Sequence, residues 1–486
     1  MKIRRVFNIS IPMFSSMMIL LGMSLSSSAL DFPGPKPGAA HSQVVDQHEL
    51  RLFNDLISFS WSTSGDILKP VSVINLLSGE KIDLKNREIF VIELGGGEIK
   101  SSEMRISDSR KPLQQTLTGD SNASTLSKRH PGRQFELVLT ASDPRCTIIW
   151  RAELRDGANA IRQSIEILPF SDPCLIKQIQ LIALPSQGVA PGGAVPGSPL
   201  MLNHFFWAYE HPNAEIHSNA NEAQCFLRLH QVLQPGEALA QSWAVGVAPE
   251  DQMRRAFLYY IERERAHPYR PFLHYNSWYD ICWGNQKINE EQCLKVIDGF
   301  GQELIRKRNV KLASFVWDDG WDDPATLWRP VTKNFPNGFS TMLQTARSYG
   351  STLGFWLSPF GGYGQPAKDR LTFGKEQGFE FKNDKFSLAG AKYYERFLET
   401  CSTFIQRDGA NFFKFDGLTR DVSETQAMLR LTQALRKLDQ DLFISITTGT
   451  WPSPFWLWYG DSTWRGDGDM GFHGPGPKRE QWITYR

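Results

Sequence analysis

The stretch at 412–417 (FFKFDG) decides how the second half of this chain is interpreted. Its short apolar run is bounded by Asp408 and Gly409 on one side and by Gly417 on the other, which is typical of a fully buried strand. Lys414 interrupts the run and Asp416 ends it, although such residues are almost never buried without partners. In an α/β pattern, charges at the carboxyl end of a strand indicate a catalytic site; an ion pair that braces the core is the alternative.

Strands and helices alternate on both sides of this stretch. Helix 290–308 has a predicted start, because Asn289 and Gln292 have the spacing of a capping box. This repeated βα pattern predicts a parallel sheet or a (β/α)8 barrel. The predicted strands are 272–278, 312–317, 352–357, 412–415, 442–447 and 462–465, and the other predicted helices are 250–266, 340–349, 391–407 and 423–438.

The fold class predicted for the chain is multidomain, with a β part followed by an α/β part. Short runs of alternating polarity, such as 160–168, predict a β-sandwich domain over 44–250, and 251–271 is a helical linker. Residues 272–486 are predicted to form a catalytic (β/α)8 TIM barrel. A complete barrel has eight strands in about 250 residues, whereas about six are found here, so we expect a barrel that is truncated at its C-terminal end. An abnormal barrel is the alternative.

Residues 1–29 have the composition of a signal peptide. Lys2, Arg4 and Arg5 precede a mostly apolar stretch over 9–25, and small residues at 26–29 suit cleavage. A transmembrane anchor is the alternative for this segment, and no other segment is long and apolar enough to span a bilayer. We therefore expect a secreted or periplasmic protein without a membrane span after cleavage.

Composition excludes some partners. The chain has 486 residues, with 53 basic and 52 acidic side chains and a net charge of +1, so a nucleic-acid partner is not expected. The 15 tryptophans, among them Trp317, Trp321 and Trp328, are either core residues or stacking faces for sugars. The six cysteines have no zinc spacing; Cys282 and Cys293 either pair or remain thiols. Oligomeric state is not indicated.

Polar residues follow the predicted strands. Carboxylates, Trp, Arg and Lys at one rim of a barrel form a polar pocket with stacking surfaces, which suits a sugar. Retaining glycoside hydrolysis needs two carboxyl groups, and Asp416 and Asp469 can supply them from separate strand ends. The runs concerned are 276–280 (NSWYD), 317–321 (WDDGW), Trp356, 414–416 (KFD), 447–452 (TTGTWP) and 464–469 (WRGDGD).

These runs resemble motifs of the α-galactosidase (melibiase) clan, glycoside hydrolase families 27 and 36. The resemblance spans about 272–470, and the β-rich region resembles the sandwich that precedes the barrel in family 36. Two family features are missing: the cysteine pair that often links the nucleophile loop to the fifth-strand loop in family 27, where Leu418 and Gly449 stand nearby, and the family 36 acid/base motif C-x-S-G-G-G-R. The similar motifs are 318–321 (DDGW), 334–338 (NFPNG) with 354–356 (GFW), 414–417 (KFDG), and 464–469 (WRGDGD), which is similar to W-R-x-x-x-D.

The resemblance implies a role for each of these residues. Asp416 would be the nucleophile and Asp469 the acid/base, with Asp467 as an alternative acid. Asp318 and Asp319 could instead cap the loop that follows them. The implied sugar-binding residues are Asp318 and Asp319 for the C4 and C6 hydroxyls, Lys414 for C3 and C4, Arg465 for the C2 substituent, and Trp278 and Trp356 as pocket walls. Asp280 would touch the substrate or brace the first loop.

The resemblance implies a retaining exo-acting hydrolase of terminal α-galactosides that needs no metal or cofactor. Thr450 and Ser453 lie in a run, 450–453 (TWPS), similar to the fifth-strand loop of family 27. Small residues there leave room for an acetamido group, so an α-N-acetylgalactosaminidase is the first alternative. The second alternative is a catalytically inactive carbohydrate-binding protein, which the missing strands would favour and the retained carboxylates would not.

Overall fold

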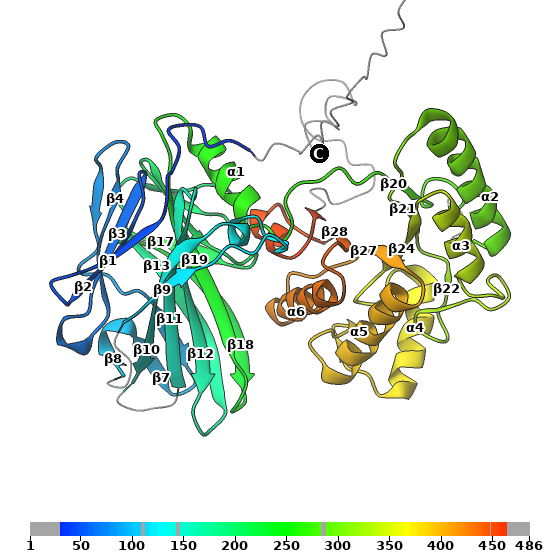
Figure 1. Cartoon of the computed structure of the whole chain (residues 1–486). Helices are drawn as coiled ribbons and strands as arrows, with labels where there is room; N and C mark the ends of the chain where they lie inside the picture. The colour runs from blue at the N-terminus through cyan, green and yellow to red at the C-terminus, as the bar shows by residue number, and fades with distance from the viewer. Residues whose placement is uncertain (1–29, 108–111, 142–145, 283–287, 448, 464–486) are drawn as a thin grey trace, which may run out of the picture.

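The computed structural model describes residues 30–107, 112–141, 146–282, 288–447 and 449–463, and structural statements below refer to these ranges. The chain forms a β-rich N-terminal part and an α/β C-terminal part that lie side by side (Figure 1). Each part has its own large apolar core, and a smaller cluster around Phe206, Tyr260 and Phe455 lies where the two parts meet.

Three antiparallel sheets form the β-rich part. The first contains β1 (His41–Val45), β2 (Glu49–Phe53), β3 (Ile57–Ser62), β4 (Lys69–Asn75) and β5 (Lys81–Asp83) in that order. The second contains, in spatial order, β14 (Val189–Pro191), β15 (Leu200–Leu202), β16 (Phe205–Tyr209), β19 (Leu239–Val247), β12 (Ala160–Pro169), β11 (Cys146–Arg155), β10 (Gly132–Thr140) and β8 (Arg105–Ile106), and β9 (Leu113–Leu117) also pairs with β10. The third contains β17 (Glu215–Ser218), β18 (Glu222–Leu233), β13 (Cys174–Pro185), β6 (Val91–Leu94) and β7 (Gly97–Lys100).

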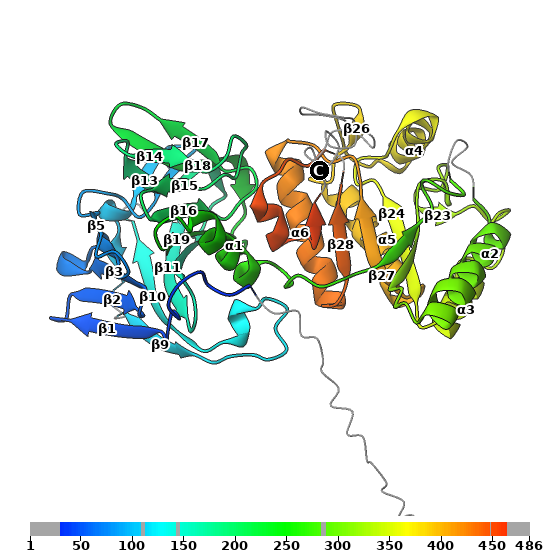
Figure 2. The ribbon, with the colours of Figure 1, turned by 90° about the horizontal axis from the view of Figure 1, so that it is seen from above.

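Burial along these strands follows the alternation read from the sequence. In β12, alternate residues such as Ile161, Ile165 and Ile167 are buried, as the alternating run at 160–168 predicts. All three sheets contribute side chains to one apolar core. Helix α1 (Met253–Glu264), within the predicted 250–266 helix, then connects the β-rich part to the α/β part (Figure 2).

One parallel sheet organises the α/β part. Its strands are β20 (His274–Asn276), β21 (Ser314–Trp317), β24 (Thr352–Leu357), β27 (Ala410–Phe415), β28 (Phe443–Ile446) and β29 (Ser462–Thr463), in chain order, and every neighbouring pair is parallel. The predicted repetition of βα units is therefore confirmed, and six strands are present in the described residues. Their carboxyl ends meet at the same edge of the sheet, which brings the loops after each strand together.

The helices between these strands are α2 (Glu290–Phe300), α3 (Ser340–Ser348), α4 (Gly364–Gln377), α5 (Ala391–Gln406) and α6 (Val422–Leu438). The predicted start of α2 is confirmed: the Gln292 backbone N–H donates to Asn289 Oδ1 at 2.9 Å, and Gln292 Oε1 accepts from the Asn289 backbone at 3.2 Å. The end of that helix differs from prediction, because Gly301–Arg306 winds as a π-helix. None of the helices described is long and apolar enough to cross a membrane.

Helix α4 was not predicted. Its sequence contains Gly364, Pro366 and Gly374, and glycine and proline both have low helix propensity. Pro366 is tolerated because it lies in the first turn, where backbone N–H groups lack intrahelical partners. A Cβ on Gly374 would lie 2.3 Å from the Phe386 ring, so the glycine is needed for close packing.

Two short hairpins complete the α/β part: β22 (Asp322–Asp323) with β23 (Arg329–Pro330), and β25 (Phe381–Lys382) with β26 (Lys385–Phe386).

Two open questions from the sequence are answered by packing. Trp317, Trp321 and Trp328 are buried in the core of the α/β part, so these three tryptophans are not stacking faces for a sugar. Cys282 and Cys293 are free thiols, and Cys282 Sγ lies 3.0 Å from Ser277 Oγ. The suggested disulfide between them is therefore not formed.

Candidate active site

Asp318 joins three strands at the carboxyl edge of the parallel sheet. It follows β21, is only 1 % exposed, and its Oδ2 accepts from Asn276 Nδ2 on β20 at 2.9 Å. The same oxygen accepts from Lys414 Nζ on β27 at 2.8 Å, forming an ion pair. Its backbone N–H donates to Ser277 Oγ at 2.8 Å. Thus Asp318 and Lys414, separated by 96 residues in sequence, meet as the strand-end pattern predicts.

Asp416 follows β27 directly and lies among uncharged donors. Trp356 Nε1 donates to its Oδ2 at 3.0 Å, and Tyr363 OH donates to Oδ1 at 3.3 Å. Thr447 Oγ1 lies 3.0 Å from Oδ1 and equally close to the Phe415 carbonyl, so its one proton serves one acceptor at a time. These donors reach both carboxyl oxygens and fix the orientation of the side chain.

The turn after β27 supplies a further donor to Asp416. Gly417 has φ +79, a left-handed conformation that glycine adopts without steric cost. In this conformation its backbone N–H donates to Asp416 Oδ1 at 2.9 Å. A Cβ at this position would approach Tyr363 OH to 3.1 Å and Ser358 Oγ to 3.2 Å. The glycine that marked the end of the strand in the sequence therefore also orients the carboxylate.

Asp319 lies in a separate ion-pair network. Arg370 Nη2 donates to its Oδ1 at 3.2 Å, and the same guanidinium binds both oxygens of Asp322 at 2.9 and 2.6 Å. Arg370 is also stacked against the rings of Trp328 and Trp356, with centroid distances of 4.6 and 5.6 Å. Burial raises the pKa of Asp319 to about 6, and Arg370 opposes that shift. Sequence reasoning missed Arg370 because it lies on α4.

The two predicted wall tryptophans differ. Trp278 is partly exposed, and the Lys414 ammonium lies 6.0 Å from its ring centroid. Trp356, on β24, is 1 % exposed and contributes its indole N–H to Asp416. Trp278 therefore has the accessibility that a wall needs, whereas Trp356 orients a carboxylate. Asp280 is exposed and accepts from Tyr275 OH at 2.7 Å, which is the bracing arrangement.

The loop after β28 is attached to the β-rich part. Trp451 Nε1 donates to the carbonyls of Pro196 at 3.1 Å and Pro212 at 2.8 Å. Ser453 Oγ donates to the Gly197 carbonyl at 3.4 Å and accepts from the backbone of the 3-10 turn Pro454–Trp458. The structure thus places Ser453 at the junction of the two parts and does not bond it to the carboxylates.

Thr450 lies between that junction and the carboxylates. It is buried, and its Oγ1 donates to the Thr447 carbonyl at 2.7 Å. Since Thr447 in turn lies against Asp416, the loop connects the β-rich part to the strand-end cluster. Arg465 and Asp469, with the alternative acid Asp467, lie outside the described residues. In the ranges described, no three His, Cys, Asp or Glu side chains are grouped so as to hold a metal ion.

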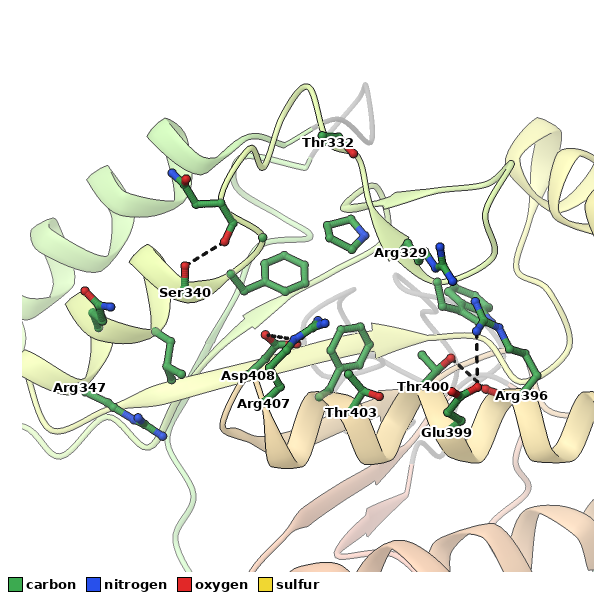
Figure 3. A pocket seen from close by; sticks show the side chains of 18 residues that line it. Arg329, Thr332, Ser340, Arg347, Arg396, Glu399, Thr400, Thr403, Arg407 and Asp408 are labelled. Atoms are coloured by element: carbon green, nitrogen blue, oxygen red, sulfur yellow. Dashed lines mark hydrogen bonds and ion pairs between the residues drawn. The ribbon is translucent and has the colours of Figure 1, made fainter.

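A cavity of about 770 Å³ lies elsewhere in the α/β part, between α3, α5 and the loop that precedes α3 (Figure 3). Arg347 and Arg329 line it together with Arg396 and Arg407. Arg407 is paired with Asp408 at 2.7 Å, and Arg396 lies 3.6 Å from Glu399. The described carboxylates and tryptophans of the candidate site do not line this cavity.

Comparison with known proteins supports the fold. No protein-family model matches the chain, and no curated protein sequence matches it. An α-galactosidase from Lactobacillus brevis superposes with a TM-score of 0.62 and 13% identity, over 91% of this chain and 75% of that one. A family 36 α-galactosidase from Geobacillus stearothermophilus, in complex with raffinose, gives 0.59 and 13% over 90% and 77%. The galactosidase domain of an α-galactosidase–sucrose kinase gives 0.57 and 10% over 88% and 75%.

The chain therefore has the fold of the family 36 α-galactosidases. This confirms at the level of fold the resemblance that the strand-end motifs indicate. Fold alone does not assign an activity, because one fold supports many unrelated sites.

Proposed function

We propose that this protein is a retaining exo-acting glycoside hydrolase that removes terminal α-linked galactose. The observation that carries the proposal is the placement of Asp416 at the carboxyl edge of a parallel sheet, oriented by the donors of Trp356, Tyr363 and Gly417. The adjacent Asp318–Lys414 pair offers both acceptors and donors for sugar hydroxyls. This edge is where barrel enzymes carry their catalytic residues.

In the proposed first step, one oxygen of Asp416 attacks the anomeric carbon as the bond to the leaving oxygen breaks. Asp469 donates a proton to that oxygen, so the aglycone departs as an alcohol. In the second step Asp469, now ionised, takes a proton from water, and the resulting oxygen attacks the anomeric carbon to release Asp416. The assignment of Asp469 rests on its motif, and so does that of Arg465 at the C2 substituent.

The substrate pocket is proposed to use the remaining strand-end residues. Lys414 would donate to the C3 and C4 hydroxyls, and Asp318 and Asp319 would accept from C4 and C6. Because Asp319 also binds Arg370, we propose that the guanidinium holds this carboxylate in place while it contacts the sugar. Trp278 would pack against the apolar face of the ring.

The same proposal includes the architecture. The three antiparallel sheets over 44–250 would form the sandwich that precedes the barrel in family 36, joined to it through 251–271. The six parallel strands would belong to a (β/α)8 barrel that begins near residue 272. Export as a secreted or periplasmic protein is proposed from the composition of 1–29 alone.

Thr450 supports a second candidate function. Its side chain is small and lies in the loop that contacts the Asp416 cluster, so an N-acetyl group at C2 would meet less bulk there. Thr450→Glu should then lower activity on aryl α-N-acetylgalactosaminides more than on aryl α-galactosides. Equal loss on both substrates would argue against a specificity role. Ser453, which contacts Gly197, is expected to affect stability first.

The decisive experiment is to trap the covalent intermediate. A 2-deoxy-2-fluoro-galactosyl fluoride should glycosylate the nucleophile slowly, with loss of the anomeric fluoride, and peptide mass spectrometry should locate the sugar on Asp416. Asp416→Gly should be inactive on aryl α-galactosides and regain turnover with azide, giving a galactosyl azide of inverted configuration. Labelling of another carboxylate would overturn the assignment. A protein that binds galactose but is neither labelled nor active would be a carbohydrate-binding protein.

A further inference from the structure

A groove of about 730 Å³ lies where the β-rich and α/β parts meet. One wall is formed by the end of β18, the start of β19 and the hairpin between them. The other wall is formed by α6 and Tyr459. Helix α6 packs against β18, and in Figure 2 it lies on the side of the parallel sheet that faces the β-rich part. The groove is therefore bounded by elements from both parts.

The groove is lined by apolar residues, mostly alanines and leucines, and by several hydrogen-bonding side chains. Four carboxamides contribute to it: Gln231, Gln241, Gln426 and Gln433. One acid, Glu237, and one base, Arg430, balance each other in formal charge. This composition differs from that of the arginine-lined cavity described above, and it favours a neutral ligand over an anionic one.

His211 is part of the wall and is uncharged. Burial lowers its pKa to about 3. Its Nδ1 accepts from the Asn213 backbone at 3.0 Å, so the ring proton must be on Nε2. That nitrogen lies 2.9 Å from Gln426 Nε2, which is also a donor, so the carboxamide must be turned by 180° to bring its oxygen to the ring proton. The NH2 group of Gln426 is left to donate in another direction.

Three of the carboxamides differ in exposure. Gln433 is exposed, Gln231 is half-buried and Gln241 is only 7 % exposed. The side-chain atoms of Gln241 are not among the fully buried polar atoms that lack a partner in the described residues, so they are open to the groove. A bound ligand with many hydroxyls would satisfy them, because each hydroxyl both donates and accepts.

We propose that this groove is a second carbohydrate-binding site that holds a neutral saccharide chain. Carboxamides, the imidazoles of His211 and His230, and one acid with one base match a ligand rich in hydroxyls and without charge. The groove also adjoins the candidate active site along the chain, because the loop 417–421 joins Asp416 to the first turn of α6, where Ser423 and Gln426 line the groove. Binding in the groove does not depend on hydrolysis; only the identity of the chain as substrate rests on the proposed function.

The test is affinity electrophoresis through gels that contain a neutral galactomannan. The Asp416→Asn protein is used so that the polymer is not cleaved, and excess galactose occupies the terminal-sugar site. The Asp416→Asn protein, whose groove is unaltered, should migrate more slowly in a gel with galactomannan than in a gel without it. The double variant Gln241→Met, Gln433→Met should bind about tenfold more weakly, since two hydrogen-bonding groups are removed with little change in side-chain shape. Gln344→Met, on the arginine-lined cavity, is the matched control and should migrate like the parent.

The same variants separate ligand binding from packing. If Gln241 is only an unsatisfied core amide, Gln241→Met should raise the unfolding temperature and leave retardation unchanged, which would overturn the proposal. Absence of retardation in the parent would also overturn it. Failure of the proposed function would give a different result. If the Asp416→Asn protein still cleaves galactomannan, the assignment of Asp416 as the nucleophile is wrong, but the conclusion on binding in the groove is unaffected. Thermal unfolding of each variant confirms that it is folded.

Discussion

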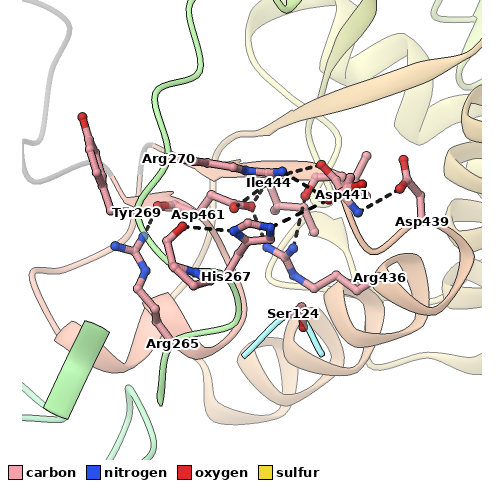
Figure 4. A network of polar contacts seen from close by, with 12 residues as sticks. Ser124, Arg265, His267, Tyr269, Arg270, Arg436, Asp439, Asp441, Ile444 and Asp461 are labelled. Carbon is pink, nitrogen blue, oxygen red and sulfur yellow. Dashed lines mark hydrogen bonds and ion pairs between the residues drawn. The ribbon is translucent and has the colours of Figure 1, made fainter. Parts of the chain in front are cut away.

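Two aspartates at opposite ends of the parallel sheet are buried to the same extent but have different partners. Asp416 follows β27 and Asp461 precedes β29, and each is 8 % exposed. Asp461 accepts from Arg436 Nη2 at 2.6 Å and from the Ile444 backbone at 2.8 Å, with Arg270 at 3.6 Å (Figure 4). The donors described around Asp416 are instead an indole, a phenol, a hydroxyl and a backbone N–H.

Under the proposed function, this difference separates a structural carboxylate from the proposed nucleophile. At Asp461, the guanidinium groups of Arg436 and Arg270 compensate the charge and join α6 to the segment after α1, and the Ile444 backbone N–H adds β28. Breaking such a pair leaves a buried charge uncompensated, so its contribution is to stability. At Asp416, the described indole, phenol, hydroxyl and backbone donors orient the oxygens, which suits the nucleophilic role proposed for this residue. Asp319 combines both features, because it binds Arg370 and lies beside Asp318.

The largest expected effect is on turnover at Asp416. Asp416→Asn preserves shape and should lower kcat for an aryl α-galactoside by on the order of 10⁴-fold or more, because the amide cannot form the covalent intermediate. The unfolding temperature should change little. Turnover is measured from steady-state initial rates. Activity close to that of the parent would contradict the assignment of Asp416 as the nucleophile.

Asp461→Asn should show the opposite pattern. We expect a loss of about 3–5 kcal/mol in the free energy of unfolding, because the largely buried Arg436 guanidinium loses its carboxylate partner. Turnover per folded molecule should remain unchanged at low temperature. The control is Asp441→Asn, whose side chain is 88% exposed and should cost less than about 1 kcal/mol. Similar losses in the two variants, measured by urea unfolding, would show that burial does not distinguish them.

Asp319 predicts a pH dependence of stability. Its folded pKa of about 6 exceeds the ordinary value of 3.8, so the folded state holds the proton more tightly. Its stabilising effect is complete below pH 3.8 and is lost as the pH rises through 6. Asp319→Asn should remove up to about 3 kcal/mol of this pH dependence. Parallel pH profiles of unfolding free energy for parent and variant would argue against a raised pKa.

The smallest effect concerns the orientation of Asp416. Trp356→Phe removes the 3.0 Å indole hydrogen bond and should lower kcat about tenfold, since a hydrogen bond to a charged group contributes about 1.5–3 kcal/mol. Tyr363→Phe removes a 3.3 Å contact and should cost less. Aryl α-galactoside kinetics measure both, and KM should move less than kcat. A larger loss for Tyr363→Phe would reverse the assigned order of the donors.

Local patterns were enough to predict much of this molecule. The alternation at 160–168, the capping residues at 289 and 292, and the succession of βα units each depend on neighbours within a few turns or one strand. For the same reason, Asp318, Lys414 and Asp416 could be placed at strand ends, since parallel strands bring their carboxyl ends to one edge. The order of the six strands followed from this regularity.

Contacts between distant segments required the folded chain. The residues next to Arg370 in sequence do not indicate that it pairs with Asp319 and Asp322. Helix α4 itself was not predicted, because its glycines and proline have low helix propensity. The hydrogen bonds from Trp451 to the carbonyls of Pro196 and Pro212 could likewise not be predicted from the neighbouring sequence. Hydrogen bonds and ion pairs of this kind depend on distance in space, whereas propensity and periodicity report only on residues close in sequence, so the partners of a buried charge emerge only when the elements pack.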